Sequence, residues 1–282
     1  MEKIGQHFLT NKIKLQKIAA SLDLKADDTV IEIGPGHGEL TSFLIKDFRF
    51  IPSDFQLIAI EKDENFVHFL QKKFKSNENI KIIEGDALKI LPKLIGQLPD
   101  YSITNYKIVG NIPYYITGHL LRIIGELENK PKLIILTIQK EVAERICAEP
   151  PRMNLLAASV QVWAEPKIID YIPKTDFRPQ PKVDSAIIKL KSITVSMRSH
   201  KKCYEIGAEE YYKLIKILFK QPRKTILNNL VSSIKYQVLS AKKRKSKEEI
   251  IKILEELKIN PGDRPQNLTI EQVKKIEEQL KG

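Results

Sequence analysis

The segment Val109–Tyr115, V-G-N-I-P-Y-Y, joins a carboxamide, a proline and two aromatic rings directly after an apolar run. The amide oxygen of Asn111 and the backbone carbonyl of Ile112 can together accept both hydrogens of an exocyclic amine. Pro113 restricts the turn that presents these two acceptors. The ring of Tyr114 can stack on the planar base that carries the amine. The segment therefore contains the groups needed to hold an aminated base.

Two interpretations of this loop are open. The first is a proline-containing turn after a buried strand, with no role in chemistry. The second is a catalytic loop, because the tetrapeptide N-I-P-Y resembles the catalytic loop of nucleic-acid methyltransferases that act on amino groups. The choice depends on whether other motifs supply the rest of a site.

A glycine-rich turn, G-P-G-H-G, follows the first predicted strand at residues 34–38. Gly34 and Gly36 allow the backbone to approach a ligand closely, because no Cβ intervenes. The spacing differs from the G-x-G-x-x-G of dinucleotide-binding proteins, and the nearby acid Glu32 disfavours a pyrophosphate. A sulfonium cofactor with an amino-acid tail has no phosphate and is compatible with this turn.

Acidic residues stand at the ends of the next two predicted strands. Glu61 lies 23 residues past Gly38, close to the spacing of a ribose-binding acid, and can accept both ribose hydroxyls. Asp86 can accept a hydrogen bond from an adenine amine, with Ala87 and Leu88 against the ring. Each acid could instead cap the helix that follows it. Three strand ends in succession favour a nucleoside site.

Short β-branched runs alternate with longer amphipathic runs from residue 29 to 148, which predicts a parallel sheet covered on both faces. Two more strands, at about 160–171 and 183–191, are expected to close this sheet with an antiparallel edge. The predicted parallel strands are Thr29–Ile33, Leu57–Glu61, Ile80–Glu84, Tyr106–Gly110 and Lys132–Ile138, and the clearest helices are Glu64–Lys75, Gly118–Leu127 and Gln139–Ala148.

The C-terminal part of the chain, from about residue 208, is predicted to contain helices only. We therefore divide the chain into residues 1–191 and a helical domain at 192–282. The charge is +3 in the first part and +9 in the second, and residues 211–247 hold eleven basic residues and no acid. Unopposed like charges favour a polyanionic partner, so we assign phosphate contacts here. The residues chosen for RNA contact are Arg223, Lys224, Lys243 and Arg244.

The composition excludes several classes of protein. No apolar run approaches the roughly 20 residues that a membrane-spanning helix needs. Two cysteines, Cys147 and Cys203, suggest no disulfide framework, which is typical of a cytoplasmic protein. The five histidines are scattered, so we expect no metal site.

The motifs together resemble the small-subunit ribosomal RNA adenine dimethyltransferases (the KsgA/RsmA type). The resemblance runs nearly from end to end of the chain, with the motifs in order. They are GQHFL at 5–9, EIGPGHGELT at 32–41, EKD at 61–63, GDAL at 85–88, NIPYYIT at 111–117, QKEVAERI at 139–146, FRPQPKVDSA at 177–186, RKT at 223–225 and NNL at 228–230.

This resemblance implies a Rossmann-like methyltransferase domain with a seven-stranded, mostly parallel mixed sheet, and a small all-helical C-terminal domain. It implies S-adenosylmethionine as cofactor and dimethylation of adenine N6 in small-subunit RNA, within an immature ribosomal subunit. We expect a cytoplasmic monomer. The first motif often has Asn where this chain has His7. The implied cofactor contacts are His7, Leu9, Gly34, Glu61, Asp86 and Asn111, to which we add Gly36 and Ala87 from the turn and the third strand end.

The proposed chemistry assigns a role to each residue of the loop. Hydrogen bonds from both N–H groups of adenine to Asn111 and Ile112 favour a pyramidal nitrogen whose lone pair can attack a methyl group. Pro113 fixes the turn and Tyr114 stacks the base. Phe177 is the candidate for the opposite face of the base, and its alternative interpretation is an ordinary core aromatic.

Two competing functions remain open at this point. A large-subunit RNA adenine methyltransferase of the antibiotic-resistance type shares the first five motifs, although FRPQPKVDSA and Asn228–Leu230 favour the small-subunit type. A ribosome-assembly or transcription factor could keep the fold and only bind RNA. The intact N-I-P-Y loop, Glu61 and Asp86 argue against lost catalysis.

Overall fold

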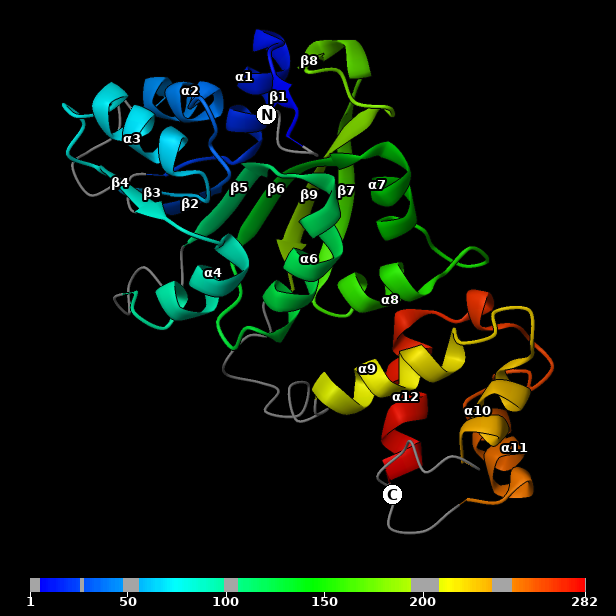
Figure 1. The fold of residues 1–282 in the computed structure, drawn as a ribbon. Helices are drawn as coiled ribbons and strands as arrows, with labels where there is room; N and C mark the ends of the chain where they lie inside the picture. The colour runs from blue at the N-terminus through cyan, green and yellow to red at the C-terminus, as the bar shows by residue number, and fades with distance from the viewer. Residues whose placement is uncertain are drawn as a thin grey trace. The chain divides into compact units, whose positions relative to one another are not determined.

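The structure is a computed structural model, and it describes residues 6–25, 28–47, 56–98, 106–193, 208–234 and 245–281. The chain forms two compact units (Figure 1). The first contains residues 1–144 and 164–192, and the second contains residues 145–163 and 193–282. Within the described parts of the chain, no helix is long and apolar enough to span a membrane.

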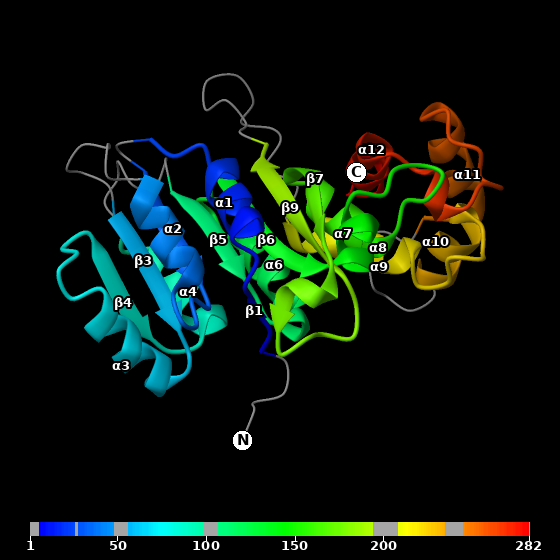
Figure 2. The same cartoon turned by 90° about the horizontal axis from the view of Figure 1, so that it is seen from above.

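The first unit is built on a seven-stranded sheet with strand order β4-β3-β2-β5-β6-β9-β7 (Figure 2). The first five of these strands are parallel, and β9 is antiparallel to both of its neighbours. The predicted mixed sheet with an antiparallel edge is therefore confirmed. The strands are β2 (Thr29–Ile33), β3 (Gln56–Glu61), β4 (Ile80–Glu84), β5 (Lys107–Asn111), β6 (Leu133–Gln139), β7 (Ala164–Ile172) and β9 (Ser185–Ser192).

Both faces of the central strand β2 are covered, because all five of its residues are buried. Val30 belongs to the core cluster that includes residues of α1 and α2, and Ile31 is equally buried on the other face. This burial explains why most residues of the central strands are apolar. The helices described in this unit are α1 (Lys12–Ser21), α2 (Glu39–Asp47), α3 (Glu64–Lys73), α4 (Ala87–Ile95), α6 (Thr117–Glu126) and the first five residues of α7 (Lys140–Ile146).

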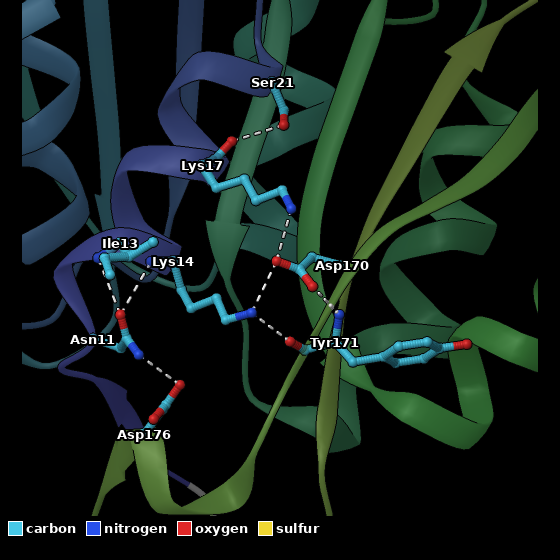
Figure 3. Close-up of polar contacts among 8 residues, drawn as sticks. All are labelled: Asn11, Ile13, Lys14, Lys17, Ser21, Asp170, Tyr171 and Asp176. Atoms are coloured by element: carbon cyan, nitrogen blue, oxygen red, sulfur yellow. Dashed lines mark hydrogen bonds and ion pairs between the residues drawn. The ribbon is translucent and has the colours of Figure 1, made fainter.

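The N-terminal segment pairs with a part of the same unit that is distant in sequence. Strand β1 (Phe8–Leu9) pairs with β8 (Phe177–Arg178), so segments almost 170 residues apart in sequence lie side by side. The Asn11 side chain caps α1 and also donates to the Asp176 carboxylate at 2.8 Å (Figure 3). These contacts hold the first motif of the chain over the sheet.

A second set of contacts fixes α1 to the edge strand β7 (Figure 3). Lys14 and Lys17 place their Nζ atoms 2.8 Å and 2.9 Å from Asp170 Oδ2. The hydrogen bonds from Lys14 and Lys17 lower the pKa of Asp170 to about 2, so its carboxylate stays charged. The register of β7 is irregular between Ile168 and Asp170, where this contact is made.

The described residues of the second unit form helices and turns around an apolar core, in agreement with the predicted helical domain. Its last helix begins after Thr269, whose side chain and backbone exchange hydrogen bonds with Gln272. The helices are α8 (Leu155–Gln161), α9 (Ala208–Leu218), α10 (Ile226–Ile234), α11 (Lys247–Glu256) and α12 (Ile270–Lys281).

The expected division at residue 191 needs one correction, because residues 145–163 belong to the second unit. The α8 residues Ala157 and Ala158 lie in the helical core, and the Tyr211 hydroxyl donates to the Ala158 carbonyl at 3.0 Å. For the same reason the strand expected from about residue 160 begins only at Ala164.

Candidate functional site

The carboxyl ends of β2, β3, β4 and β5 surround one cavity of about 400 Å³. The strand order reverses between β2 and β5, and such a switch point is where open α/β sheets bind ligands. The volume lies within the usual range for a small-molecule site. The predicted site residues that line the cavity are His7, Leu9, Gly34, Gly36, Glu61, Asp86, Ala87, Asn111, Ile112, Pro113 and Tyr114.

The glycine-rich turn lies at the base of the cavity. Gly34 has φ +66°, which disfavours side chains, and a Cβ at this position would meet no atom within 4 Å. Open space next to bare backbone suits a ligand that must approach closely. Gly36 differs, because a Cβ there would lie 2.5 Å from the Phe8 ring. Gly36 is therefore needed for packing of the N-terminal segment.

Glu61 is buried at the end of β3, with its carboxylate held by backbone donors. The N–H groups of Lys62 and Asp63 donate to Oε1 at 2.7 Å and 2.9 Å, and that of Gly36 donates to Oε2 at 3.0 Å. Asp63, and not Glu61, caps the following helix α3. The helix-cap alternative for Glu61 is therefore wrong, and its carboxylate instead ties the glycine turn to β3.

Asp86 does cap its helix, because its Oδ1 accepts the Leu88 N–H at 3.0 Å. Its Oδ2 lies 3.0 Å from Lys62 Nζ. Burial would raise the pKa of Asp86, but the hydrogen bonds from Lys62 and Leu88 outweigh burial and lower it. Asp86 is therefore a charged acceptor on the cavity wall as well as a helix cap.

Asn111 has one defined amide orientation. Its Nδ2 donates to the backbone carbonyl of His7 at 2.8 Å, and the His7 Nδ1 lies 2.8 Å from the carbonyl oxygen of Pro179. Because the amino half of the amide is used by His7, the Oδ1 half of Asn111 is available as an acceptor at the cavity. The first motif thus orients the Asn111 carboxamide through its backbone.

Tyr114 follows in the short 3-10 helix η2 (Tyr114–Ile116). Its hydroxyl lies 2.6 Å from the Ser185 hydroxyl, and its ring centroid is 5.8 Å from that of His7. Burial raises the pKa of Tyr114, and the hydrogen bond with Ser185 offsets part of this shift. Pro113, with φ −57°, precedes this helix and fixes its entry.

Phe177 is not at the site, which corrects one of the sequence predictions. Its side chain is fully buried in a core cluster with Leu9, Leu15 and Val109, and it does not line the cavity. Phe177 in β8 pairs with Leu9 in β1, and this pairing places its ring in the core. The alternative interpretation of Phe177 as a core aromatic is the one that the structure supports.

Glu32 is an acid on the cavity wall that sequence reasoning used only to argue against a pyrophosphate. It is 1% exposed, and the Thr41 hydroxyl donates to its Oε2 at 2.7 Å. Burial, reinforced by the charges of Glu61 and Glu39 and only partly offset by Thr41, raises the pKa of Glu32 from 4.5 to about 7.

This shift predicts a pH dependence of stability. A raised pKa in the folded state means that protonation of Glu32 favours folding, so this contribution is complete below about pH 4.5 and is lost as the pH rises through about 7. Relative to Glu32→Gln, the wild-type free energy of unfolding should therefore fall between these pH values and level off above them. Urea titrations of both proteins across this range provide the measurement, and parallel pH profiles would contradict the assignment.

Arg223 and Lys224 lie exposed in the second unit, in the turn between α9 and α10. Asn229 is 2% exposed and anchors this turn by donating to the carbonyls of Gln221, Lys224 and Thr225 at 3.1–3.3 Å. The other two residues predicted to contact RNA, Lys243 and Arg244, lie outside the described residues.

Sequence reasoning missed two contributors to the site. The ring centroid of Phe8 lies 4.5 Å from that of His37 and 5.6 Å from that of Phe66. Phe8 thus packs the N-terminal segment against the glycine-rich turn. Lys62 reaches across to Asp86 at the cavity mouth. Both residues stand inside motifs already noted, G-Q-H-F-L and E-K-D, but nothing in their types revealed these partners.

The strand order, the antiparallel edge and the location of the cavity define the Rossmann-like methyltransferase fold. Comparison with known proteins agrees. A solved dimethyladenosine transferase from Plasmodium falciparum superimposes with a TM-score of 0.74 at 26% identity, covering 95% of both chains. The 23S rRNA methyltransferase ErmE superimposes with a TM-score of 0.70 over 98% of this chain and all of that one, and at 22% identity this likeness shows the fold alone.

Sequence comparison identifies the family. The family model described as "Ribosomal RNA adenine dimethylase" matches residues 1–278. The ribosomal RNA small subunit methyltransferase A of Dehalococcoides mccartyi is 37% identical over 275 residues, covering 97% of this chain and 86% of that protein. The chain belongs to the ribosomal RNA adenine dimethylase family.

Proposed function

We propose that this chain is an S-adenosylmethionine-dependent enzyme that dimethylates the N6 amine of adenines in small-subunit ribosomal RNA. Its family membership and a relative named for the small subunit support the substrate. The observation that carries the chemistry is the amide of Asn111, which is oriented by His7 with its oxygen available at the cavity. An immature subunit as substrate, a monomeric state and a cytoplasmic location belong to the same proposal.

The cavity fits S-adenosylmethionine. The bare backbone at Gly34 provides the close approach, and the carboxylates of Glu61 and Asp86 suit ribose hydroxyls and the adenine amine. Ala87 lies beside Asp86 and offers an apolar contact for the adenine ring. When bound, this cofactor supplies a methyl group on a positively charged sulfur, and the charged carboxylate of Asp86 on the cavity wall is compatible with that charge.

Replacing Glu61 tests the cofactor assignment. We expect Glu61→Ala to weaken binding of S-adenosylmethionine by about 1.5–3 kcal/mol, the range for hydrogen bonds to a charged group. Glu84→Ala is the matched control, because Glu84 pairs in register with Glu61 at the end of β4 and is exposed. Calorimetry should show reduced affinity for the first variant only. Unchanged affinity of Glu61→Ala would remove this residue from the cofactor site.

The residues of the N-I-P-Y loop act on the target amine. Asn111 Oδ1 and the Ile112 carbonyl accept its two N–H groups, which directs the nitrogen lone pair away from the loop. Tyr114 stacks the base, and the hydrogen bond between its hydroxyl and Ser185 fixes the position of its side chain. The amine nitrogen becomes positively charged on methylation, so its proton can pass to water without a strong base.

The second unit contributes the contact with RNA phosphates. Arg223 and Lys224 are exposed on a turn that the buried Asn229 holds in one conformation. Fixed cations give phosphate contacts that position an RNA without reading its sequence. We include Lys243 and Arg244 in this role on the evidence of the sequence alone.

Methyl transfer to purified subunits separates the candidate functions. The protein is incubated with labelled S-adenosylmethionine and either small subunits that lack the modification or large subunits. We expect label in the small-subunit RNA only. Label in the large subunit would favour the antibiotic-resistance type, and tight subunit binding without any transfer would favour a binding factor on the same fold.

A further inference from the structure

Tyr115 is the exposed member of the N-I-P-Y-Y-I-T loop. Its side chain is 71% exposed, whereas Ile112 and Thr117 are 2% and 3% exposed. The 3-10 helix η2 directs the side chain of Tyr115 away from that of Tyr114, because consecutive side chains on such a helix point about 120° apart. The ring of Tyr114 turns toward Ser185, and the ring of Tyr115 therefore turns outward.

Hydrogen bonds fix the conformation of the turn that carries Tyr115. The Ile116 N–H donates to the Pro113 carbonyl at 3.1 Å, and the Thr117 N–H donates to the Tyr114 carbonyl. The hydroxyl of Tyr114 is itself bound to Ser185. An aromatic ring on a fixed turn loses little conformational entropy when a flat partner stacks on it.

A cation lines the same cavity as this ring. Tyr115 and Lys62 both line the cavity that holds Asn111. The Lys62 side chain is 68% exposed, and its Nζ lies 3.0 Å from Asp86 Oδ2. An exposed aromatic ring and a lysine at one site are the combination with which proteins bind single-stranded nucleic acid, by stacking a base and contacting its phosphate.

We propose that Tyr115 stacks on the nucleotide adjacent to the target adenine, with Lys62 near the phosphate of that nucleotide. This inference rests on the proposed function. To reach Asn111 the target base must leave the base stack, and its neighbour then loses a stacking partner. Tyr115 follows Tyr114 directly in the chain, so it can replace that partner while Tyr114 holds the target. Tyr115 would thus stabilise the RNA in its opened conformation.

Steady-state kinetics with unmodified small subunits test the role of Tyr115. Tyr115→Ala should lower kcat/KM for the subunit by about 5- to 150-fold, the range for loss of one base–aromatic stack. Tyr115→Phe and Tyr115→Trp should keep most of the wild-type value, and Tyr115→Leu should not, because only an aromatic ring restores stacking. Tyr171→Ala is the matched control, since Tyr171 is 44% exposed and does not line the cavity.

Calorimetry with S-adenosylmethionine on the same variants completes the test. Every variant should bind the cofactor with wild-type affinity, which also shows that each has folded. A wild-type kcat/KM for Tyr115→Ala would overturn the inference, as would a loss of cofactor affinity with an unchanged KM for the subunit. An inactive wild-type protein would instead count against the proposed function itself.

Discussion

Asn111→Ala is expected to lower the rate of methyl transfer to small subunits by about 10²–10³-fold, the effect of removing one preorganised acceptor from a reacting centre. In the proposed mechanism the carboxamide accepts a hydrogen bond from an N–H group of the target amine and makes no other contact with the RNA. The structure adds that its orientation comes from the carbonyl of His7, 2.8 Å from Nδ2. Affinity for the subunit should therefore be largely retained.

Single-turnover kinetics at saturating cofactor measure this effect directly. Asn79→Ala is the matched control, because Asn79 is an exposed carboxamide outside the cavity of the same unit. Asn111→Asp gives a second comparison, since it keeps the acceptor oxygen but presents a carboxylate to the His7 carbonyl. A rate for Asn111→Ala within a factor of a few of wild type would contradict the proposed role of the amide.

Lys107→Met is expected to lower the stability of the first unit by about 3–5 kcal/mol, the usual cost of leaving one member of a buried ion pair alone. Lys107 and Asp28 are 3% and 1% exposed, with Nζ and Oδ2 2.5 Å apart. The same ammonium donates to the carbonyls of Leu22 and Asp23 at 2.9 Å and 2.6 Å. Its loss leaves a buried carboxylate without its cation and two carbonyls without this donor.

Denaturant-dependent hydrogen exchange of the β5 amides reports on this unit alone. Lys81→Met, at an exposed position of β4, should show no comparable loss. Lys107→Met combined with Asp28→Asn should recover part of the stability, because the unpaired charge is then removed. Equal stability of Lys107→Met and the wild type would mean that this ion pair contributes nothing to the fold.

The parallel strands were predictable because each is a short, largely apolar run, and four of the five, β2, β3, β5 and β6, are almost completely buried. Thr29–Ile33 and Ile80–Glu84 agree residue by residue with β2 and β4. The carboxyl ends of parallel strands lie at one edge of the sheet. The sequence alone therefore predicted that Glu61, Asp86 and Asn111 lie at one site, and all three line the same cavity.

Features that depend on distant partners were not predictable. The strands β1 and β8 are two residues long and exist only because they pair with each other. That pairing buries Phe177, which the sequence could equally assign to the base pocket. Likewise α8 joins the helical unit through contacts with residues some 50 positions away, so no local signal marked it.

Asp86 shows another limit of prediction from sequence. One residue can have both of the roles that were considered as alternatives. It caps α4 and also lines the cavity with its pKa lowered. Composition and spacing predicted that this acid lies at the site, but only the structure shows that a helix cap can also line the cavity.

Methylation of the N6 amine of adenine in small-subunit RNA is tested most directly by mass analysis of nucleosides from unmodified small subunits after incubation with the protein and S-adenosylmethionine. We expect N6,N6-dimethyladenosine in subunits treated with the wild type, and little or none after equal treatment with Asn111→Ala. Methylation of another base, or of the large subunit alone, would contradict it.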